Sequence, residues 1–347
     1  MVFASRAVSR LTAFRLHGLQ HRGGTTVLWN ELRRHSEVDD FGEAFQSGVD
    51  YSEGTFLQNV YPRFGVGEEY SYLPSKLPGA STGKQGKVRS NGLGVYALGP
   101  EDTVHWTEAH PLVTAESQAS VLNSFGYFWK QRASKRIWLE KSPPNLHMGR
   151  FLQALFNLGL GNKWDVGPGV ALEPLRSSSA VKFIWISRHP IANALAHRAL
   201  PECADLSVKS LVKHWVVAHE YANADLPYLA DVKQLTLEAF VTEPLTHLTD
   251  LWAWLGLEPD PKQEELKKAL ARRVRRDPNA KYRGSYCRQA LGSPSQARDH
   301  QRLVKELNPR VTALSGLGYD LDEWPCLAGV ASLAKQAKQG QDTKTEL

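Results

Sequence analysis

The stretch VKFIWISRHP, residues 181–190, decides the fold class of this 347-residue chain. Residues 181–186 are apolar apart from Lys182, which is typical of a parallel strand that is buried on both faces. A polar turn ends the strand, and Pro190 suits the first turn of a following helix. Because parallel sheets bind ligands at the carboxyl ends of their strands, Arg188 lies where a guanidinium would meet a phosphate. An ordinary exposed arginine is the alternative interpretation.

A second unit of strand, turn and helix opens the chain. Residues 11–19 are apolar enough for a strand, Arg22-Gly23-Gly24 interrupts it, and helical spacing follows over residues 25–32. The segment GLQHRGGTT (18–26) would place backbone N–H groups at a helix N-terminus, where they form an anion-binding site. A tight turn without a ligand is the alternative interpretation.

A third strand end carries a lysine. The apolar run at residues 137–139 precedes EKSPPN (140–145), so Lys141 would lie at the same edge of the sheet as the other two turns. The convergence of three basic or N–H-rich strand ends on one edge is much harder to explain by chance than any single one. We therefore expect an anion-binding site at this edge.

Strands and helices alternate along the rest of the chain. We expect helices over residues 113–132, 146–157, 206–228 and 245–255, a strand over 232–237, and an irregular loop over 76–99. This order predicts an α/β fold in three layers, with a central, mainly parallel sheet and helices on both faces. The sequence indicates a single domain over residues 11–325, a short N-terminal segment (1–10) and a polar C-terminal tail (331–347).

The net charge, the apolar stretches and the positions of cysteine and histidine exclude only a few classes of protein. The net charge of +6 suits a polyanionic ligand, RNA or an anionic surface equally, but no aromatic residues are interleaved with a basic stripe, which argues against nucleic acid. No stretch approaches the roughly 18 apolar residues of a membrane-spanning helix. The widely spaced Cys203, Cys287 and Cys326 predict neither a disulfide framework nor a zinc site. His214 and His219 are five residues apart, which favours a packed helix over a metal pair.

Taken in order, HRGGTT (21–26), EKSPPN (140–145) and KFIWISRHP (182–190) resemble three motifs of the PAPS-dependent sulfotransferase superfamily. Three further segments resemble one branch of that family: SEGTFLQNVYP (52–62), LTLEAFVTEPLTHLTDLWAWLGL (235–257) and LGYDL (317–321). The resemblance extends from about residue 14 to about residue 321. It implies the P-loop-like sulfotransferase fold. It also implies in-line transfer of a sulfuryl group from 3'-phosphoadenosine-5'-phosphosulfate (PAPS) to a hydroxyl or amine, with no metal.

The resemblance assigns cofactor-binding roles to three of the motifs. The family's lysine near the transferring group corresponds to Lys141, and its 3'-phosphate arginine corresponds to Arg188. The loop for the 5'-phosphosulfate corresponds to Arg22, Gly23, Gly24, Thr25 and Thr26.

Two further parts of the cofactor site are implied less directly. Many relatives have a serine eight residues after the 3'-phosphate arginine, whereas this chain has Ala196, so His197 or Arg198 would have to replace that contact. The stretch 281–287 falls where relatives fold a basic loop over the cofactor, which would bring in Arg283 and Gly284. We expect the neighbouring basic residues on a solvated helix face; they are Arg272, Arg273, Arg275 and Arg276.

The proposed chemistry needs charge stabilisation on the departing oxygen and a base for the acceptor proton. The resemblance gives the first role to Arg22 and Lys141. For the base, Glu53 is the first choice because it lies in a segment that resembles the family's acidic acceptor-side motif, Glu43 is the second and His21 the third. A solvated carboxylate is the alternative for each acid, and a structural hydrogen bond to the loop is the alternative for His21.

Two other classes of protein remain open. A P-loop nucleotide kinase or NTPase shares the opening unit, but Gly24 stands where such enzymes have a lysine. A non-catalytic nucleotide- or glycan-binding relative of the same fold is the second alternative.

The acceptor and the compartment follow less directly from the sequence. We expect a glycan, phenol or other small-molecule acceptor in a pocket shaped by residues 51–99. The sequence as given favours the cytoplasm. The resemblance implies the lumen of the Golgi or endoplasmic reticulum as the alternative if the N-terminus is incomplete, because glycan-modifying relatives are luminal. Only in that case would the terminal KTEL, which is close to an ER-retention signal, matter.

Overall fold

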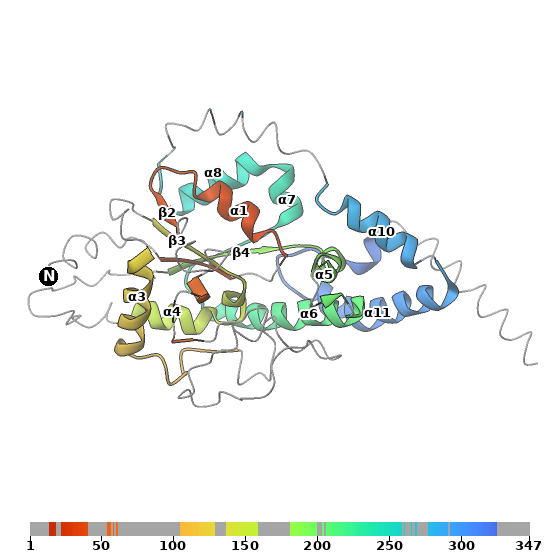
Figure 1. Cartoon of the computed structure of the whole chain (residues 1–347), viewed down its shortest axis with the longest axis horizontal. Coiled ribbons are helices and arrows are strands. Elements are labelled where there is room, and N and C mark those ends of the chain that lie inside the picture. Colours follow the sequence, from red (N-terminus) through yellow and green to blue (C-terminus); the bar gives the residue numbers. More distant parts are fainter. Residues whose placement is uncertain are drawn as a thin grey trace, which may run out of the picture.

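A computed structural model of the chain describes residues 14–18, 22–40, 54–56, 58, 60–61, 105–128, 137–158, 181–199, 203–204, 206–258, 260, 265, 268, 277–290 and 292–324. This part is an α/β fold on a five-stranded sheet, in the order β2-β3-β1-β4-β5 with every neighbouring pair parallel (Figure 1). The strands are β1 (Phe14–Gly18), β2 (Val38–Asp40), β3 (Ile137–Ser142), β4 (Val181–Ser187) and β5 (Val232–Thr236). The prediction of an α/β fold with a parallel sheet is confirmed.

Strand β1 lies at the centre of the sheet, with β3 on one side and β4 on the other. The register places Gly18 of β1 beside Ser142 of β3, and Phe14 beside Val181 of β4. Since the strands are all parallel, the turns after β1, β3 and β4 open at the same edge of the sheet, and the strand order reverses at β1. The three turns that the sequence singled out therefore meet at one edge.

Helices lie on both sides of the sheet (Figure 1). Helices α1, α7 and α8 are on one side, α3, α4 and α6 are on the other, and α5 and α10 lie beyond the carboxyl ends of the strands. The helices are α1 (Thr25–Leu32), α3 (Ala115–Phe128), α4 (Gly149–Asn157), α5 (Pro190–Arg198), α6 (Val208–Asp225), α7 (Leu237–Thr242), α8 (Pro244–Trp254), α10 (Ala280–Ala290) and α11 (Pro294–Thr312). Short 3-10 helices are η3 (Gly54–Phe56), η5 (Pro143–His147), η7 (Leu226–Tyr228) and η8 (Leu321–Glu323).

The side chains of β4 show why its apolar run forms a buried strand. Phe183 and Trp185 join a core with α3, α4 and α6, whereas Ile184 and Ile186 join a second core with α1 and α8. Successive residues of a strand point to opposite faces, so a strand that is covered on both sides needs apolar residues throughout. Lys182 is tolerated because its Nζ donates to the carbonyl of Trp254 at 2.7 Å.

Capping residues and prolines set the element boundaries that sequence periodicity misplaced. Helix α6 begins at Val208 because the Ser207 hydroxyl accepts from a backbone N–H of its first turn. Thr236 caps α7 in the same way, so β5 stops one residue before its predicted end. The helix predicted over 146–157 begins only at Gly149, after two prolines have started η5. The predicted loop over 76–99 lies outside the described residues.

Cysteine pairing differs from the expectation. Cys203 is buried and free, whereas Cys287 in α10 is disulfide-bonded. The absence of a disulfide was therefore a wrong prediction for Cys287, because spacing along the chain does not show which cysteines the fold brings together. Cys326 lies outside the described residues.

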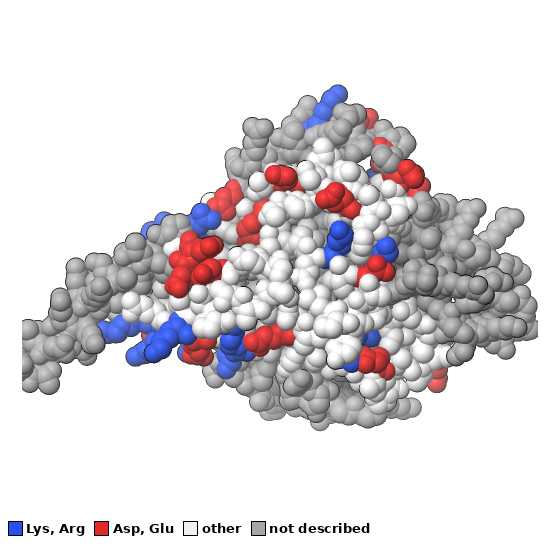
Figure 2. Space-filling model, turned by 180° about the vertical axis from the view of Figure 1, so that it is seen from behind, with Lys and Arg blue, Asp and Glu red and all other residues white. Residues whose placement is uncertain are grey.

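The surface and the helices bear on possible partners. Among the helices that the structure describes, none is both long and apolar enough to cross a membrane. On the face seen in Figure 2, the acidic and basic side chains of the described residues are interspersed and form no continuous basic stripe.

Candidate functional site

The turn after β1 has the backbone of an anion-binding loop. Arg22 (φ 64°) and Gly24 (φ 102°) both adopt left-handed conformations, and α1 starts directly after them. No side chain caps α1, and the first N–H groups of any α-helix lack an intrahelical acceptor. Gly23 and Thr25 are buried, whereas Arg22 and Thr26 are exposed. The loop can therefore offer backbone donors and a cationic side chain to one anion.

Gly24 also fixes where this loop lies. A Cβ atom at position 24 would lie 2.6 Å from Cδ1 of Leu237, the first residue of α7, so only glycine fits both the conformation and the contact. This close approach places the loop against the carboxyl end of β5. It also excludes a lysine at the position where nucleotide hydrolases have one.

Lys141 lies inside β3, one residue before its end, and the register pairs it with His17 of β1. The sequence predicted a strand that stopped at residue 139, but the strand continues to Ser142. Lys141 is buried, with 4% of its surface exposed. A buried lysine beside the central strand is held near the edge where the three turns meet.

Glu140, the residue before Lys141, binds the segment that follows Glu53. Its Oε1 accepts from the backbone N–H of Gly54 at 2.8 Å, and its Oε2 accepts from Nδ2 of Asn145 at 2.5 Å. The N–H of Thr55 donates to the Ser142 hydroxyl at 3.0 Å. These bonds dock η3 on the end of β3. The three candidate bases, His21, Glu43 and Glu53, lie outside the described residues.

Arg188 occupies the turn between β4 and α5, as the sequence predicted. Its side chain is largely buried, and its Nε donates to Oδ1 of Asn279 at 2.8 Å while Nη2 donates to the carbonyl of Pro278. The guanidinium lies over the ring of Tyr282, 4.7 Å from its centroid. Burial lowers the pKa of Arg188, and Tyr282 and Glu238 oppose this effect.

Glu238 connects the elements around this arginine. Its Oε1 accepts from the backbone N–H of His189 at 3.0 Å and from Nδ2 of Asn279 at 2.6 Å, and its Oε2 accepts from the hydroxyl of Tyr319 at 2.8 Å. The sequence motifs assign no role in the site to Glu238 or to Asn279. The only available signal was the place of Glu238, two residues after the end of β5.

Helix α5 carries the residues that would replace the missing serine. Ala196 and His197 are buried, and Arg198 is the last residue of the helix. Burial is the main cause that lowers the pKa of His197 to about 3, and the charges of His214 and Arg22 contribute to that lowering. Strand β1 pairs directly with β4, so the loop after β1 lies beside the turn that leads into α5. The turns after β1 and β4 are thus brought together.

The stretch that was expected to form a basic loop is helical. Arg283 and Gly284 lie within α10, and Arg283 forms an ion pair with Asp277 at 2.8 Å. Burial lowers the pKa of His189 to about 4, and the charge of Arg283 contributes to that lowering. Arg272, Arg273, Arg275 and Arg276 lie outside the described residues.

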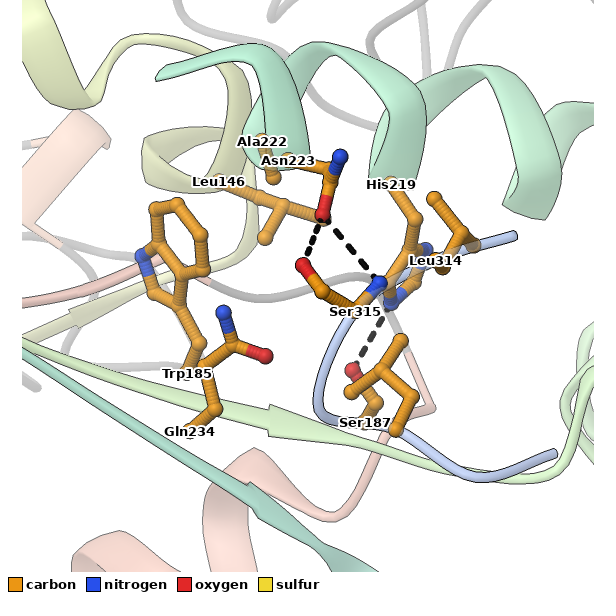
Figure 3. A pocket seen from close by; sticks show the side chains of 10 residues that line it. Leu146, Trp185, Ser187, His219, Ala222, Asn223, Gln234, Leu314 and Ser315 are labelled. Carbon is orange, nitrogen blue, oxygen red and sulfur yellow. Dashed lines mark hydrogen bonds between the residues drawn. The ribbon is translucent and has the colours of Figure 1, made fainter. Parts of the chain in front are cut away.

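A small pocket lies between helix α6 and strands β4 and β5 (Figure 3). Its interior of about 20 Å³ has room for about one water molecule, so it is not a nucleotide site. At its wall, Nδ1 of His219 donates to the carbonyl of Trp215 and Nε2 accepts from the hydroxyl of Ser187, each at 2.8 Å. Burial lowers the pKa of His219 to about 3, so the ring is neutral and anchors the residue before Arg188.

The two histidines of α6, His214 and His219, contact different residues. The ring of His214 lies 6.2 Å from that of His197, whereas His219 binds Ser187. Within the described ranges, no group of three or more histidine, cysteine or acidic residues is arranged to hold a metal ion.

Comparisons with known proteins found no matching family model and no matching curated protein. The solved structures that are similar to the chain include the following three. The sulfotransferase domain of the Synechococcus PCC 7002 olefin synthase is 19% identical with a TM-score of 0.35, covering 72% of this chain and 74% of that one. A sulfotransferase from Alicyclobacillus acidocaldarius is 17% identical with a TM-score of 0.37, covering 75% and 91%. The sulfotransferase domain from the curacin biosynthetic pathway is 16% identical with a TM-score of 0.38, covering 92% and 96%. These similarities are too distant to assign an activity.

Proposed function

We propose that the chain is a sulfotransferase with a three-layer, P-loop-like fold, which uses PAPS as cosubstrate. One observation carries the proposal. The loop at residues 22–24, which precedes a helix without a side-chain cap, lies on the turn after β1, and Arg188, held by Asn279, lies on the turn after the neighbouring strand β4. Buried Lys141 lies on β3, the other neighbour of β1. A nucleotide with anionic groups at both its 5' and its 3' positions needs two such separate anion sites.

Each site would take one end of the nucleotide. The backbone N–H groups of the loop and Arg22 would bind the 5'-phosphosulfate, and Arg188 would bind the 3'-phosphate. Thr25, Thr26, Arg198, Arg283 and Gly284 remain proposed as further contacts. In the transfer step, the acceptor oxygen or nitrogen forms a bond to sulfur while the bond from sulfur to the phosphate oxygen breaks. Lys141 and Arg22 would stabilise the negative charge that develops on that departing oxygen.

The acceptor proton needs a base, and Glu53 is the proposed one. The anchoring of Gly54 to Glu140 supports this assignment, because it ties the residue after Glu53 to the residue before Lys141. Glu43 and His21 remain the second and third candidates. A hydroxyl or amine of a glycan, phenol or other small molecule would be the acceptor.

The magnesium-dependent alternative receives less support from the geometry. Such enzymes hold their metal with a carboxylate at the end of the strand beside β1, and here that strand end carries Lys141. The neighbouring Glu140 already accepts hydrogen bonds from Gly54 and Asn145 through its two oxygens.

The disulfide at Cys287 bears on the compartment. Disulfides persist in oxidising compartments and are rare in the cytoplasm. We therefore propose the lumen of the secretory pathway. Peptide mapping without reduction, on protein from its native cells, should recover Cys287 in a linked peptide, and recovery as a free thiol would contradict this placement.

Sulfuryl transfer is tested with radiolabelled PAPS and a panel of phenols, sugars and sulfated glycans. We expect label to move to at least one acceptor class, with release of adenosine 3',5'-bisphosphate and without magnesium. Lys141→Met should lower kcat by about 10²- to 10³-fold, the usual effect of removing a group that stabilises developing charge. Lys182→Met is the matched control, since Lys182 lies on β4 and binds Trp254. Nucleotide turnover that requires magnesium and ATP would contradict the proposal.

A further inference from the structure

We infer that Asn279 and Glu238 are positioning residues, which aim Arg188 at the 3'-phosphate while leaving its charge free for that phosphate. The inference rests on the proposed function and adds two residues to it. Neither residue is assigned to the site by the sequence motifs.

Asn279 is held at both ends of its side-chain amide. Its Nδ2 donates to Oε1 of Glu238 at 2.6 Å, and its Oδ1 accepts from Nε of Arg188 at 2.8 Å. An ionised carboxylate can only accept hydrogen bonds. Glu238 therefore selects the orientation in which the amide nitrogen faces the carboxylate, so that the amide oxygen faces the arginine. An amide turned the other way would present N–H groups to a guanidinium, which has no acceptor.

The backbone of Asn279 is fixed as well. Asn279 is 2% exposed, and its N–H donates to Oδ1 of Asp277 at 2.8 Å. Its carbonyl accepts from the N–H groups of Tyr282 and Arg283, at 2.9 and 2.8 Å, at the start of α10. The side chain is thus mounted on a helix terminus, which is a more rigid support than a loop.

Glu238 ties this helix terminus to two other parts of the chain. It binds the N–H of His189 in the turn after β4 and the hydroxyl of Tyr319 before η8. Burial raises the pKa of Tyr319, and the charge of Glu238 raises it further, as expected beside an ionised carboxylate. One carboxylate therefore sets the position of both partners in the bond between Asn279 and Arg188.

A neutral amide between Glu238 and Arg188 has a chemical consequence. A carboxylate in direct contact with the guanidinium would compete with a phosphate for its N–H groups and would offset its charge. The amide fixes Nε, the Pro278 carbonyl fixes Nη2, and the Tyr282 ring supports the face of the group, yet none of these three partners is an acid. The arrangement holds the guanidinium still and keeps it available for an anion.

The test compares binding of adenosine 3',5'-bisphosphate and ADP by calorimetry, in the full chain and its variants. Wild type should prefer the bisphosphate. Asn279→Ala should lower the affinity for the bisphosphate roughly 3- to 10-fold, a loss as large as the net contribution of one neutral hydrogen bond. Its affinity for ADP should change less than about twofold. Asn279→Asp should lose more than Asn279→Ala, although it preserves the shape, because it places a carboxylate against Arg188. Glu238→Gln, which is isosteric, should lower the affinity for the bisphosphate but not for ADP. It tests the same positioning role if the variants at residue 279 do not fold.

Asn308→Ala is the matched control, since Asn308 binds Asp320 and the N–H of Leu321 in the same region without contacting Glu238 or Arg188. It should leave the preference for the bisphosphate unchanged. Equal losses for both nucleotides, or binding by the Asn279→Asp variant that is as tight as wild type, would overturn the positioning role alone. A wild type without any preference for the bisphosphate would overturn the proposed function, and this inference with it.

Discussion

At the scale of single residues, Arg188 shows how a strand end becomes an anion site. Its backbone position follows from the buried strand before it and the proline after it, both of which are visible in the sequence. Its orientation depends on Asn279, 91 residues further on, and on Glu238 behind that residue. Local patterns predict where such a side chain starts but not which distant side chain holds it. Arg188 and Lys141 were therefore predictable, whereas Asn279 was not.

Replacing the arginine tests its assigned ligand. Arg188→Ala should weaken binding of adenosine 3',5'-bisphosphate by about 1.5–3 kcal/mol, the range for a hydrogen bond to a charged group, and should barely affect ADP. Calorimetric titration of both nucleotides provides the measurement. Arg310→Ala, which removes an arginine paired with Glu220 on α6, is the control. Equal losses for both nucleotides would remove Arg188 from the 3'-phosphate site.

At the scale of elements, the docking of η3 on β3 depends on Gly54. A Cβ atom there would lie 2.5 Å from Cγ of the buried Glu140 and 2.9 Å from Cζ of Phe125. The sequence motif around Gly54 was recognised, but its partner was not, because residues 54 and 140 are far apart in the chain. Likewise, the resemblance to relatives that fold a basic loop over the cofactor predicted a loop over residues 281–287, where α10 forms.

A substitution at Gly54 measures how much the packing of η3 on Glu140 contributes to the stability of the fold. Gly54→Ala should destabilise the fold by about 1–3 kcal/mol through overpacking, as measured by urea unfolding. Gly284→Ala is the matched control, because its new Cβ would meet only Nη1 of Arg288 at 3.6 Å inside a helix. That variant should be unchanged or up to about 1 kcal/mol more stable. Equal stability of wild type and Gly54→Ala would show that η3 does not pack on Glu140.

At the scale of the whole molecule, buried histidines couple stability to pH. Burial lowers the pKa of His189 and His300 to about 4, and of His197 and His219 to about 3. In the unfolded chain the same rings have a pKa of about 6.5, so below that pH the unfolded state binds more protons than the folded state. Burial also lowers the pKa of His110, and ion pairs lower the pKa of Glu108 and Glu306, so these groups act in the same direction. The raised pKa of Asp225 acts in the opposite direction but belongs to a single group.

The free energy of unfolding should therefore fall as the pH is lowered from about 6.5 toward about 4. Urea titrations at several pH values across that window measure it. His219→Gln should reduce the slope, because one fewer proton is taken up on unfolding. A stability that stays constant or rises on acidification would contradict the buried, neutral state of these rings.

The arrangement of the sheet edge was the part of the whole molecule that the sequence predicted best. Apolar strands and their following turns fix a parallel sheet, and a parallel sheet forces the turns of β1, β3 and β4 to one edge. The network around Glu238 was not predictable, because His189, Asn279 and Tyr319 lie 49, 41 and 81 residues away from it in the chain. The disulfide at Cys287 was not predictable either, because cysteine spacing does not show which cysteines the fold brings together.

A thermal-shift titration tests whether the sheet edge binds a 3'-phosphorylated nucleotide, since a ligand that binds only the folded state raises the unfolding midpoint. Adenosine 3',5'-bisphosphate, ADP and ATP are compared at equal concentrations, with and without magnesium. We predict the largest stabilisation with the 3',5'-bisphosphate, without any need for metal. Stabilisation by magnesium-ATP alone would contradict the proposed function and favour a nucleotide kinase or NTPase.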